Sequence, residues 1–325
     1  MVTSIVLFVV SLLGVTKTAD WFLSAAEKVG LYLKLPRFIM GVVLVGFGTS
    51  LPELTTSLAA VAGNESHIAV SNIMGSNIAN ILIIIGVSTI IMGTIRFTKE
   101  LIDIDLPLLT AISIFFTLLV IDGTLSRIDG ALLLAGFVGY VAYSLFFKEQ
   151  DANHHQGILM LARALFRNTP ADESNIPERP SLLTYAALIG SVIGLGLLSK
   201  IAVDSLLGIV DSLGIAVGIV SFFALAIGTS LPELVVSLKA LKLGHGDLVV
   251  GNIIGSCMFN ILLIGGVSAV LLPQELSLPD GYWMIVGLVA STILLVISGI
   301  TRRLHIWEGA SFLLVYAGLA LQLID

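Results

Sequence analysis

Long apolar runs alternate with short polar breaks along nearly the whole chain. Most of the runs are close to the ~20 residues that a helix needs to cross the apolar core of a bilayer. The pattern therefore predicts an all-α integral membrane protein with about ten transmembrane helices. The first and sixth runs are long and carry polar residues, which predicts long, tilted helices. The ten runs lie near residues 2–32, 36–62, 67–93, 104–122, 129–147, 181–211, 213–243, 247–272, 281–300 and 305–323.

Composition excludes a soluble protein. Of the 325 residues, 57% are hydrophobic and only 12% are charged, whereas a soluble domain carries about 25% charged residues. The single cysteine, Cys257, lies in an apolar run, so we expect no disulfide framework. The start of the chain lacks the basic segment of a signal peptide, so residues 2–16 are interpreted as the beginning of the first membrane helix.

The stretch 148–180 differs from the rest of the chain. It is rich in charged and amide side chains and holds three of the nine prolines. This composition predicts a solvated linker between two halves, residues 1–147 and 181–325. Each half then contains five of the predicted spans.

The two halves are repeats of each other. The sequence Gly-Thr-Ser-Leu-Pro-Glu-Leu occurs at 48–54 and again at 228–234, an offset of 180 residues. The same offset pairs Asn72 with Asn252 and continues to the Gly-Val-Ser sequences at 86–88 and 266–268. Because five spans is an odd number, the second half enters the membrane from the opposite side. The prediction is two inverted five-helix repeats, an architecture of many secondary transporters.

Lysine and arginine gather on one predicted face. Loops that join spans 1–2, 3–4, 5–6, 7–8 and 9–10 hold thirteen of the sixteen, and the opposite face holds only Arg127. Loops rich in Lys and Arg stay in the cytoplasm. We therefore expect the central linker in the cytoplasm and both termini outside. Lys17 and Lys200 lie within spans.

Two glutamates near the middle of spans are the strongest candidates for function. Glu53 and Glu233 each follow a proline. An ionisable side chain inside a membrane is costly, so its presence there indicates a function. Pro52 has no N–H, so the carbonyl of Gly48 loses its helical partner. Each of these spans is therefore expected to be broken, with free carbonyls near a glutamate. The hydroxyls of Thr49, Ser50, Thr229 and Ser230 lie within one turn of these carboxylates.

Neighbouring spans add polar faces. Asn72, Ser76 and Asn80 are spaced i, i+4 and i+8, which puts them on one side of a helix, and Asn252, Ser256 and Asn260 repeat the spacing. The combined ligands are carboxylate, hydroxyl, amide and carbonyl oxygens, a set that hard cations such as Ca2+ and Na+ prefer. These ions are expected as transported substrates, and no cofactor is expected.

Simpler interpretations stay open for some of these residues. A single Pro-Glu could be a helix kink with a protonated, hydrogen-bonded glutamate, although its recurrence at matched positions argues against this. Asn72 and Asn252 fit helix packing as well as ion binding. Asp20 and Lys200 occupy matched repeat positions and could form an ion pair or be solvated separately.

The repeated motifs resemble a known family. Each Gly-Thr-Ser-Leu-Pro-Glu is followed by Gly-Ser-x-x-x-Asn, and residues 18–22 read Thr-Ala-Asp-Trp-Phe. This signature resembles the Ca2+/cation antiporter superfamily, in particular the prokaryotic Na+/Ca2+ exchangers. The resemblance implies an antiporter in a prokaryotic inner membrane, exchanging Ca2+ for Na+ by alternating access, with the first and sixth helices sliding across a fixed core.

The resemblance also implies the ion ligands. These would be Thr49, Ser50, Glu53, Ser76, Asn80, Thr229, Ser230, Glu233 and Ser256, with the carbonyls of Gly46 and Ala226. Asn260 stands where some relatives have Asp, so the site has one acid fewer. The larger Na+ load implied by the family would move net charge in each cycle.

Other functions remain open at this point. The H+-coupled branch of the superfamily typically shows Gly-Asn-Ala-Val-Glu, so the sequence favours Na+, with a Ca2+/H+ antiporter as the alternative. A passive channel is a further alternative. An intramembrane lipid-phosphate enzyme is more distant, since no Lys, Arg or His lies near the motifs within the membrane. We expect no enzymatic activity, no nucleic acid and no obligate protein partner.

Overall fold

The computed structural model describes residues 2–33, 35, 37–64, 66–97, 101–146, 179–212, 228–276 and 280–322, and these ranges are mostly helical. Widened π-helical turns are labelled η. The first half contains α1 (Val2–Tyr32), α2 (Arg37–Met40), η1 (Gly41–Gly46), α3 (Phe47–Thr49), α4 (Leu51–Ala62), α5 (Ser66–Ala79), η2 (Asn80–Ile85), α6 (Gly86–Met92), β1 (Thr94–Arg96), η3 (Leu101–Asp105), α7 (Leu106–Val120), β2 (Thr124–Leu125) and α8 (Arg127–Phe146). The second contains α10 (Leu182–Ser212), α12 (Leu231–Lys242), α13 (Gly246–Met258), η4 (Phe259–Ile264), α14 (Gly265–Leu271), β3 (Gln274–Glu275), α15 (Asp280–Gly299), β4 (Arg303–His305) and α16 (Ile306–Gln322).

The helices coincide with the predicted runs to within a few residues. Among the described residues, six helices are long and apolar enough to cross a membrane, and the bent pair Gly41–Thr49 and Leu51–Ala62 makes a seventh if it counts as one span. Of the predicted run 213–243, only the part from Gly228 onward is described. The predicted linker lies outside the described residues except for Arg179 and Pro180, so the division into 1–147 and 181–325 stays a prediction.

Both glutamate-bearing spans are interrupted at a serine. Ser50 has φ −86° and ψ 5°, and the helices on its two sides are bent by 45°. Ser230 has nearly the same backbone, φ −87° and ψ 7°, directly before α12. Pro52 explains the first break, because it cannot donate to the preceding turn. The predicted break of the first span is therefore confirmed, and its backbone recurs in the second repeat.

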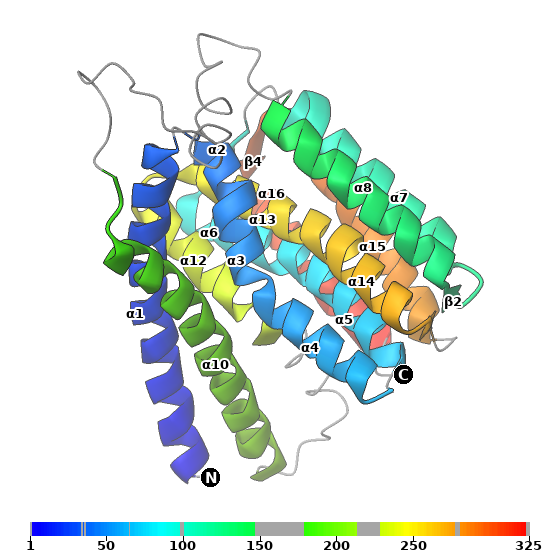
Figure 1. The fold of residues 1–325 in the computed structure, drawn as a ribbon, viewed down its shortest axis with the longest axis horizontal. Coiled ribbons are helices and arrows are strands. Elements are labelled where there is room, and N and C mark those ends of the chain that lie inside the picture. The colour runs from blue at the N-terminus through cyan, green and yellow to red at the C-terminus, as the bar shows by residue number, and fades with distance from the viewer. Residues whose placement is uncertain are drawn as a thin grey trace.

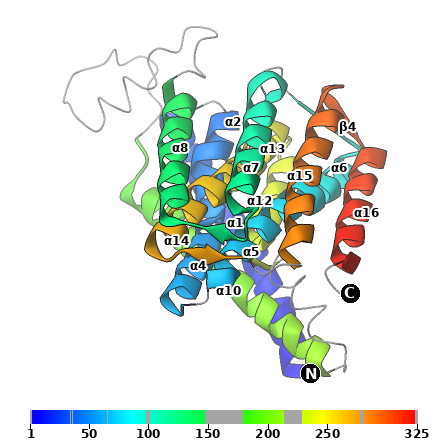
Figure 2. The same ribbon diagram turned by 90° about the vertical axis from the view of Figure 1, so that its right-hand side faces the viewer.

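The molecule is arranged around a central group of helices. In an 18-residue apolar stretch of each of the spans Ile68–Met92 and Gly246–Leu271, 83% of the residues are buried, against 22% in the corresponding stretches of α1 and α10. The two long helices α1 and α10 lie side by side at one edge (Figure 1), and α7, α15 and α16 stand beside one another on the other side (Figure 2). The helices that carry the glutamates, α4 and α12, lie between these groups.

Matched helices of the two repeats run antiparallel where they touch. Along α1 and α10 the neighbours are Ser4 and Gly208, Gly14 and Leu198, and Thr18 and Gly194. Along α7 and α15 they are Leu106 and Gly299, and Ser113 and Thr292. One residue number rises as the other falls, so each pair is antiparallel.

Two short β-ribbons each join a loop of one repeat to a loop of the other, and the repeat offset relates the two ribbons. β1 pairs with β4, and β2 pairs with β3, both antiparallel. Under the 180-residue offset β1 corresponds to β3 and β2 to β4, so exchanging the halves converts one ribbon into the other. The loops after α6 and α15 therefore lie together, and so do those after α7 and α14.

Close helix contacts depend on glycine in both repeats. A Cβ on Gly130 of α8 would lie 2.8 Å from the carbonyl oxygen of Gly266, and one on Gly309 would lie 2.9 Å from the carbonyl oxygen of Gly86. Small residues let helix backbones approach this closely in membrane proteins. The contacts α8–α14 and α6–α16 therefore have little room for larger side chains.

A pair of substitutions within α8 tests this packing. We expect Gly130→Val to destabilise the protein by about 1–3 kcal/mol, because the added atoms overfill the contact with α14. Gly139→Val is the matched control, since a Cβ there meets nothing within 4 Å. Thermal unfolding in detergent should show a lower midpoint for Gly130→Val alone. Equal midpoints for the two variants would contradict the close contact.

Candidate cation-binding site

The two predicted glutamates lie in the first turns of α4 and α12, directly after the breaks. Their relative exposures are 1% for Glu53 and 0% for Glu233. The N-terminal turn of a helix carries partial positive charge, which favours a carboxylate there. The break in each span thus has a second effect, because it creates a helix N-terminus at the depth of the buried acid.

Hydroxyl groups from both repeats reach Glu233. Ser50 does not cap α4; its Oγ instead donates to Glu233 Oε1 at 3.0 Å. Ser256 Oγ lies 3.5 Å from the same oxygen and 3.2 Å from the carbonyl oxygen of Gly46. A further contact between the repeats joins Ser76 Oγ and Thr229 Oγ1 at 3.2 Å. Residues separated by roughly half the chain therefore form one cluster.

Many polar atoms of this cluster are buried and accept or donate no hydrogen bond among the described residues. They belong to five side chains, and six of the seven atoms are oxygens. A buried polar atom without a partner costs about 1–3 kcal/mol, and a charged one costs more. Such a concentration of unpaired oxygens indicates a cation site. The atoms are Glu53 Oε1 and Oε2, Glu233 Oε2, Asn80 Oδ1 and Nδ2, Asn260 Oδ1 and Ser230 Oγ.

Asn80 and Asn260 stand at widened turns of the backbone. Asn80 begins η2, and Asn260 is the second residue of η4. Single π-helical turns inside α-helices occur frequently at functional sites. Both side chains are fully buried. The sequence pattern predicted their position on the polar face but not the change in helical pitch.

Of the twelve residues predicted for the site, the structure describes eleven, and it brings them together. Ten are buried, while Thr229 is partly exposed. Thr49 Oγ1 lies 3.0 Å from the carbonyl oxygen of Val45 and 3.2 Å from Asn252 Oδ1. The carbonyl of Gly46 already accepts from the Ser50 N–H and Ser256 Oγ. Ala226 lies outside the described residues.

Asn72 and Asn252 brace the glutamate-bearing helices. Asn72 Nδ2 donates to the carbonyl oxygen of Glu53 at 3.4 Å and to Ser57 Oγ at 3.1 Å. Asn252 Nδ2 makes the corresponding bonds to Glu233 at 3.5 Å and to Ser237 at 3.0 Å. Of the two interpretations left open by the sequence, these contacts support helix packing.

Three residues of the cluster's surroundings were missed from the sequence. Ser57 and Ser237 each lie four residues after a glutamate, so the repeat offset could have revealed them. Asn77 could not be found in this way, because the matched residue is Cys257. Its amide lies among buried polar groups and contacts Asn260.

The donor set suits a hard cation and not a soft one. Within the described residues, no group of three or more His, Cys, Asp or Glu side chains could hold a metal ion. Two carboxylates and neutral oxygens fit Ca2+ or Na+, whereas Zn2+ and Cu2+ would need softer ligands. Two carboxylates also neutralise one divalent ion, which offsets much of the cost of burying either charge.

A cavity of about 550 Å3 reaches the edge of this cluster. It lies between α4 and α10 and ends at Pro52 and Thr229, the neighbours of Glu53 and Ser230. Its walls on α4 include Thr55, Thr56 and Ala59, towards the end of that helix. The cavity therefore lies next to the cluster, on the side of α4.

Comparison with known proteins gives consistent matches along the whole chain. Residues 3–146 and 183–324 match the family described as sodium/calcium exchanger protein. The chain is 30% identical over 330 residues to the putative antiporter CaxA of Alkalimonas amylolytica, covering 98% of each protein. It is 27% identical to the sodium/calcium exchanger MaX1 of Methanosarcina acetivorans, covering 95% of this chain and 96% of the other. A solved structure of the sodium-calcium exchanger NCX_Mj matches with a TM-score of 0.79 and 27% identity, covering 99% of each chain.

The site makes a direct prediction about the carboxylates. Glu53→Gln and Glu233→Gln should each weaken Ca2+ binding by about a hundredfold or more, because a half-neutralised divalent ion in a buried site costs several kcal/mol. Isothermal titration of the protein in detergent measures this. Glu275→Gln, at an exposed position, is the matched control. Near-normal Ca2+ affinity in either site variant would show that its carboxylate is not a ligand.

Proposed function

Because the chain belongs to the sodium/calcium exchanger family, we propose that it is a secondary active antiporter that exchanges Ca2+ for Na+ by alternating access. The family and the matched fold are those of membrane transporters, so the chain is an integral membrane protein. The observation that carries the proposal is the buried cluster of unpaired oxygens around Glu53 and Glu233. The side chains that hydrogen-bond to the Glu233 carboxylate are hydroxyls, which suits ion binding better than phosphate chemistry.

The proposed architecture is ten spans in two inverted repeats. Antiparallel contact between α1 and α10, and between α7 and α15, supports the inversion. The exchange of β-ribbons between the halves supports a twofold relation. The positive charge of the predicted cytoplasmic loops then puts the linker inside and the termini outside. On this topology the cavity beside α4 opens outside the cell.

Coupling to Na+ is favoured over coupling to H+ by the repeated Gly-Thr-Ser-Leu-Pro-Glu, which differs from the Gly-Asn-Ala-Val-Glu typical of the H+-coupled branch. A proton needs only a carboxylate oxygen, whereas Na+ needs several oxygens around it. Asn80, Asn260 and Ser230 contribute buried oxygens with no partner among the described residues. These oxygens can serve as ligands for Na+ and for Ca2+ alike. A Ca2+/H+ antiporter is the alternative that the transport assay addresses.

The charge of the site decides whether transport is electrogenic. Glu53 and Glu233 together supply two negative charges, and Ca2+ cancels both. Three Na+ would leave one positive charge, so each exchange would move net charge across the membrane. Each such charge is worth about 2.3 kcal/mol per 100 mV. We therefore propose electrogenic exchange.

Flux in proteoliposomes tests the proposal. An outward Na+ gradient should drive 45Ca2+ uptake, and an inside-negative potential should change its rate, since net charge moves. Gradients of K+ and of pH, imposed singly, are the controls. Uptake driven by pH without Na+ would establish H+ coupling instead. Uptake with no current and no response to voltage would reject the load of three Na+.

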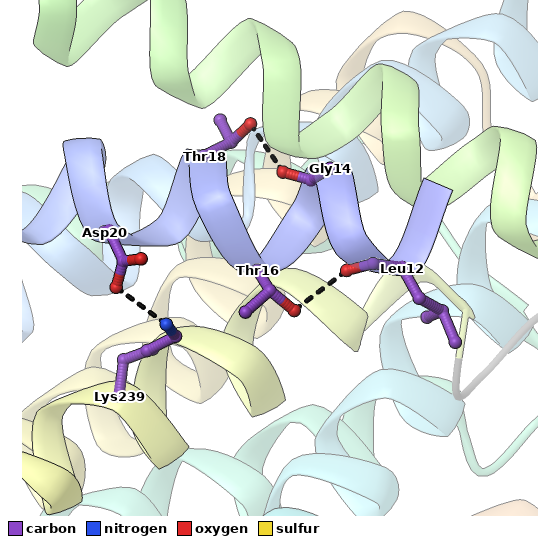
Figure 3. Close-up of polar contacts among 6 residues, drawn as sticks. All are labelled: Leu12, Gly14, Thr16, Thr18, Asp20 and Lys239. Carbon is purple, nitrogen blue, oxygen red and sulfur yellow. Dashed lines mark hydrogen bonds and ion pairs between the residues drawn. The ribbon is translucent and has the colours of Figure 1, made fainter. Parts of the chain in front are cut away.

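An ion pair between α1 and α12 is a contact that could favour one state of the proposed cycle. Asp20 of α1 lies 2.8 Å from Lys239 Nζ of α12 (Figure 3). Asp20 thus pairs with Lys239 and not with Lys200, which lines the cavity. α1 packs against α12 here, while a cavity lies between parts of the matched pair α10 and α4, which touch at Gly196 and Pro52. The packing of the long helices is therefore looser beside α4 than beside α12.

The ion pair exists in only one of the two expected states. In an inverted-repeat transporter the opposite state resembles this one with the roles of the repeats exchanged. Lys200 would then take the place of Asp20, and Ala59 that of Lys239. No ion pair forms between these two. The pair between Asp20 and Lys239 should therefore favour the state described, by at most about 1 kcal/mol, because it is partly exposed.

Lys239→Ala tests this bias, because it gives α12 the alanine that α4 has at the matched position, Ala59. In a Cys257→Ala background, a cysteine at Thr55 should react with thiol reagents up to about fivefold more slowly when Lys239 is replaced, because the cavity is open for less time. Lys242→Ala is the control on the same helix. The exchanged pair Asp20→Lys with Lys239→Asp should restore reactivity. Unchanged reactivity in Lys239→Ala would exclude a role for the ion pair.

A further inference from the structure

Two buried amides of opposite repeats are joined in a directional relay. Asn260 Nδ2 donates to Asn77 Oδ1 at 3.1 Å, and Asn77 Nδ2 donates to the backbone carbonyl oxygen of Cys257 at 3.3 Å. Asn77 and Asn260 have 0% exposed surface. The remaining atom, Asn260 Oδ1, is buried and has no hydrogen-bond partner among the described residues.

The backbone carbonyl sets the direction of the whole relay. A carbonyl oxygen only accepts, so the group of Asn77 that faces Cys257 has to be its NH2. The oxygen of Asn77 then faces Asn260 and needs a donor. Only the NH2 of Asn260 can supply one, and this leaves the oxygen of Asn260 on the other side.

That oxygen belongs to the cation cluster by its place in the fold. Asn260 lies four residues after Ser256, on the same side of the helix, and Ser256 Oγ reaches Glu233. The turn η4 also packs against α4, which carries Glu53, and against α5, which carries Asn77. Reversal of the amide would direct an NH2 group at the ion instead of an oxygen.

We propose that Asn77 is a positioning residue that fixes the amide of Asn260, so that its oxygen faces the transported cation. The inference rests on the proposed function, because it assigns an ion ligand and explains its orientation. An orientation set before binding spares the cost of ordering the side chain, about 0.5–1.5 kcal/mol.

The matched place in the other repeat lacks a second amide. Cys257 occupies the position of Asn77, and both polar atoms of Asn80 are without hydrogen-bond partners in the described part of the chain. Only one of the two related amides is therefore paired with another amide. The relay also requires an amide at 260, because a carboxylate there has no hydrogen to give Asn77 Oδ1.

The requirement for an amide at position 260 provides a double-mutant test. Asn77→Ala should raise the half-saturating concentration of the cation that Asn260 contacts, Na+ or Ca2+, by about three- to tenfold. In an Asn260→Asp background the same change should weaken neither ion, because both terminal atoms of Asp are oxygens and its orientation no longer matters. Titrations of Na+ and Ca2+ in detergent measure binding in all four proteins, including any that transport slowly.

Two further variants separate positioning from packing. Cys257→Ala removes the matched side chain but keeps the carbonyl that accepts from Asn77, and it should leave both affinities unchanged. If Asn77→Ala does not fold, Asn77→Ser is titrated instead, with the same expectation, because serine is too short to join Cys257 and Asn260.

The outcomes are distinct. Weakening confined to the Asn260 background supports the positioning role. Equal weakening in both backgrounds, or normal affinities for both ions in folded Asn77→Ala, overturns it. Failure of the unmodified protein to bind Ca2+ or Na+ overturns the proposed function itself and not the relay alone.

Discussion

Two carboxylates buried deep in an apolar helical bundle are the constraint on which the rest of this structure depends. An unpaired charge in such surroundings costs several kcal/mol, and two neighbouring charges of the same sign raise that cost. Glu53 and Glu233 are tolerable together only if positive charge joins them. The cluster of unpaired oxygens around them therefore has meaning mainly as a binding site, and a divalent cation balances its charge.

The backbone is shaped by the same constraint. Breaks at Ser50 and Ser230 put helix N-termini beside the acids, and π-helical turns carry Asn80 and Asn260. Asn72 and Asn252 hold the glutamate-bearing helices by bonding to the backbone oxygens of the glutamates. Close glycine contacts elsewhere let the surrounding helices pack tightly enough to keep this arrangement together.

Departures from the repeat symmetry carry as much information as the symmetry. Asn77 faces Asn260, whereas Cys257 stands at the matched place, and Asp20 pairs with Lys239, whereas Ala59 matches the lysine. A transporter that alternates between two related states needs them to be similar in free energy. Small asymmetric contacts, each on the order of 1 kcal/mol, are suited to adjusting that balance without abolishing either state.

The sequence by itself determined the membrane class, the positions of the helices, the repeat offset and the two acids. These features depend on local properties, namely apolar length, proline chemistry and the cost of a charge in hydrocarbon. The roles of Asn72, Asn77 and Lys239 were decided only by the tertiary structure. Each role depends on a group from a distant segment and on the direction of a donor or charge, and neither can be read from spacing along one helix. The same holds for the cavity beside α4, because the motif shared by the two repeats cannot show which of the two glutamate-bearing helices a long helix covers more closely.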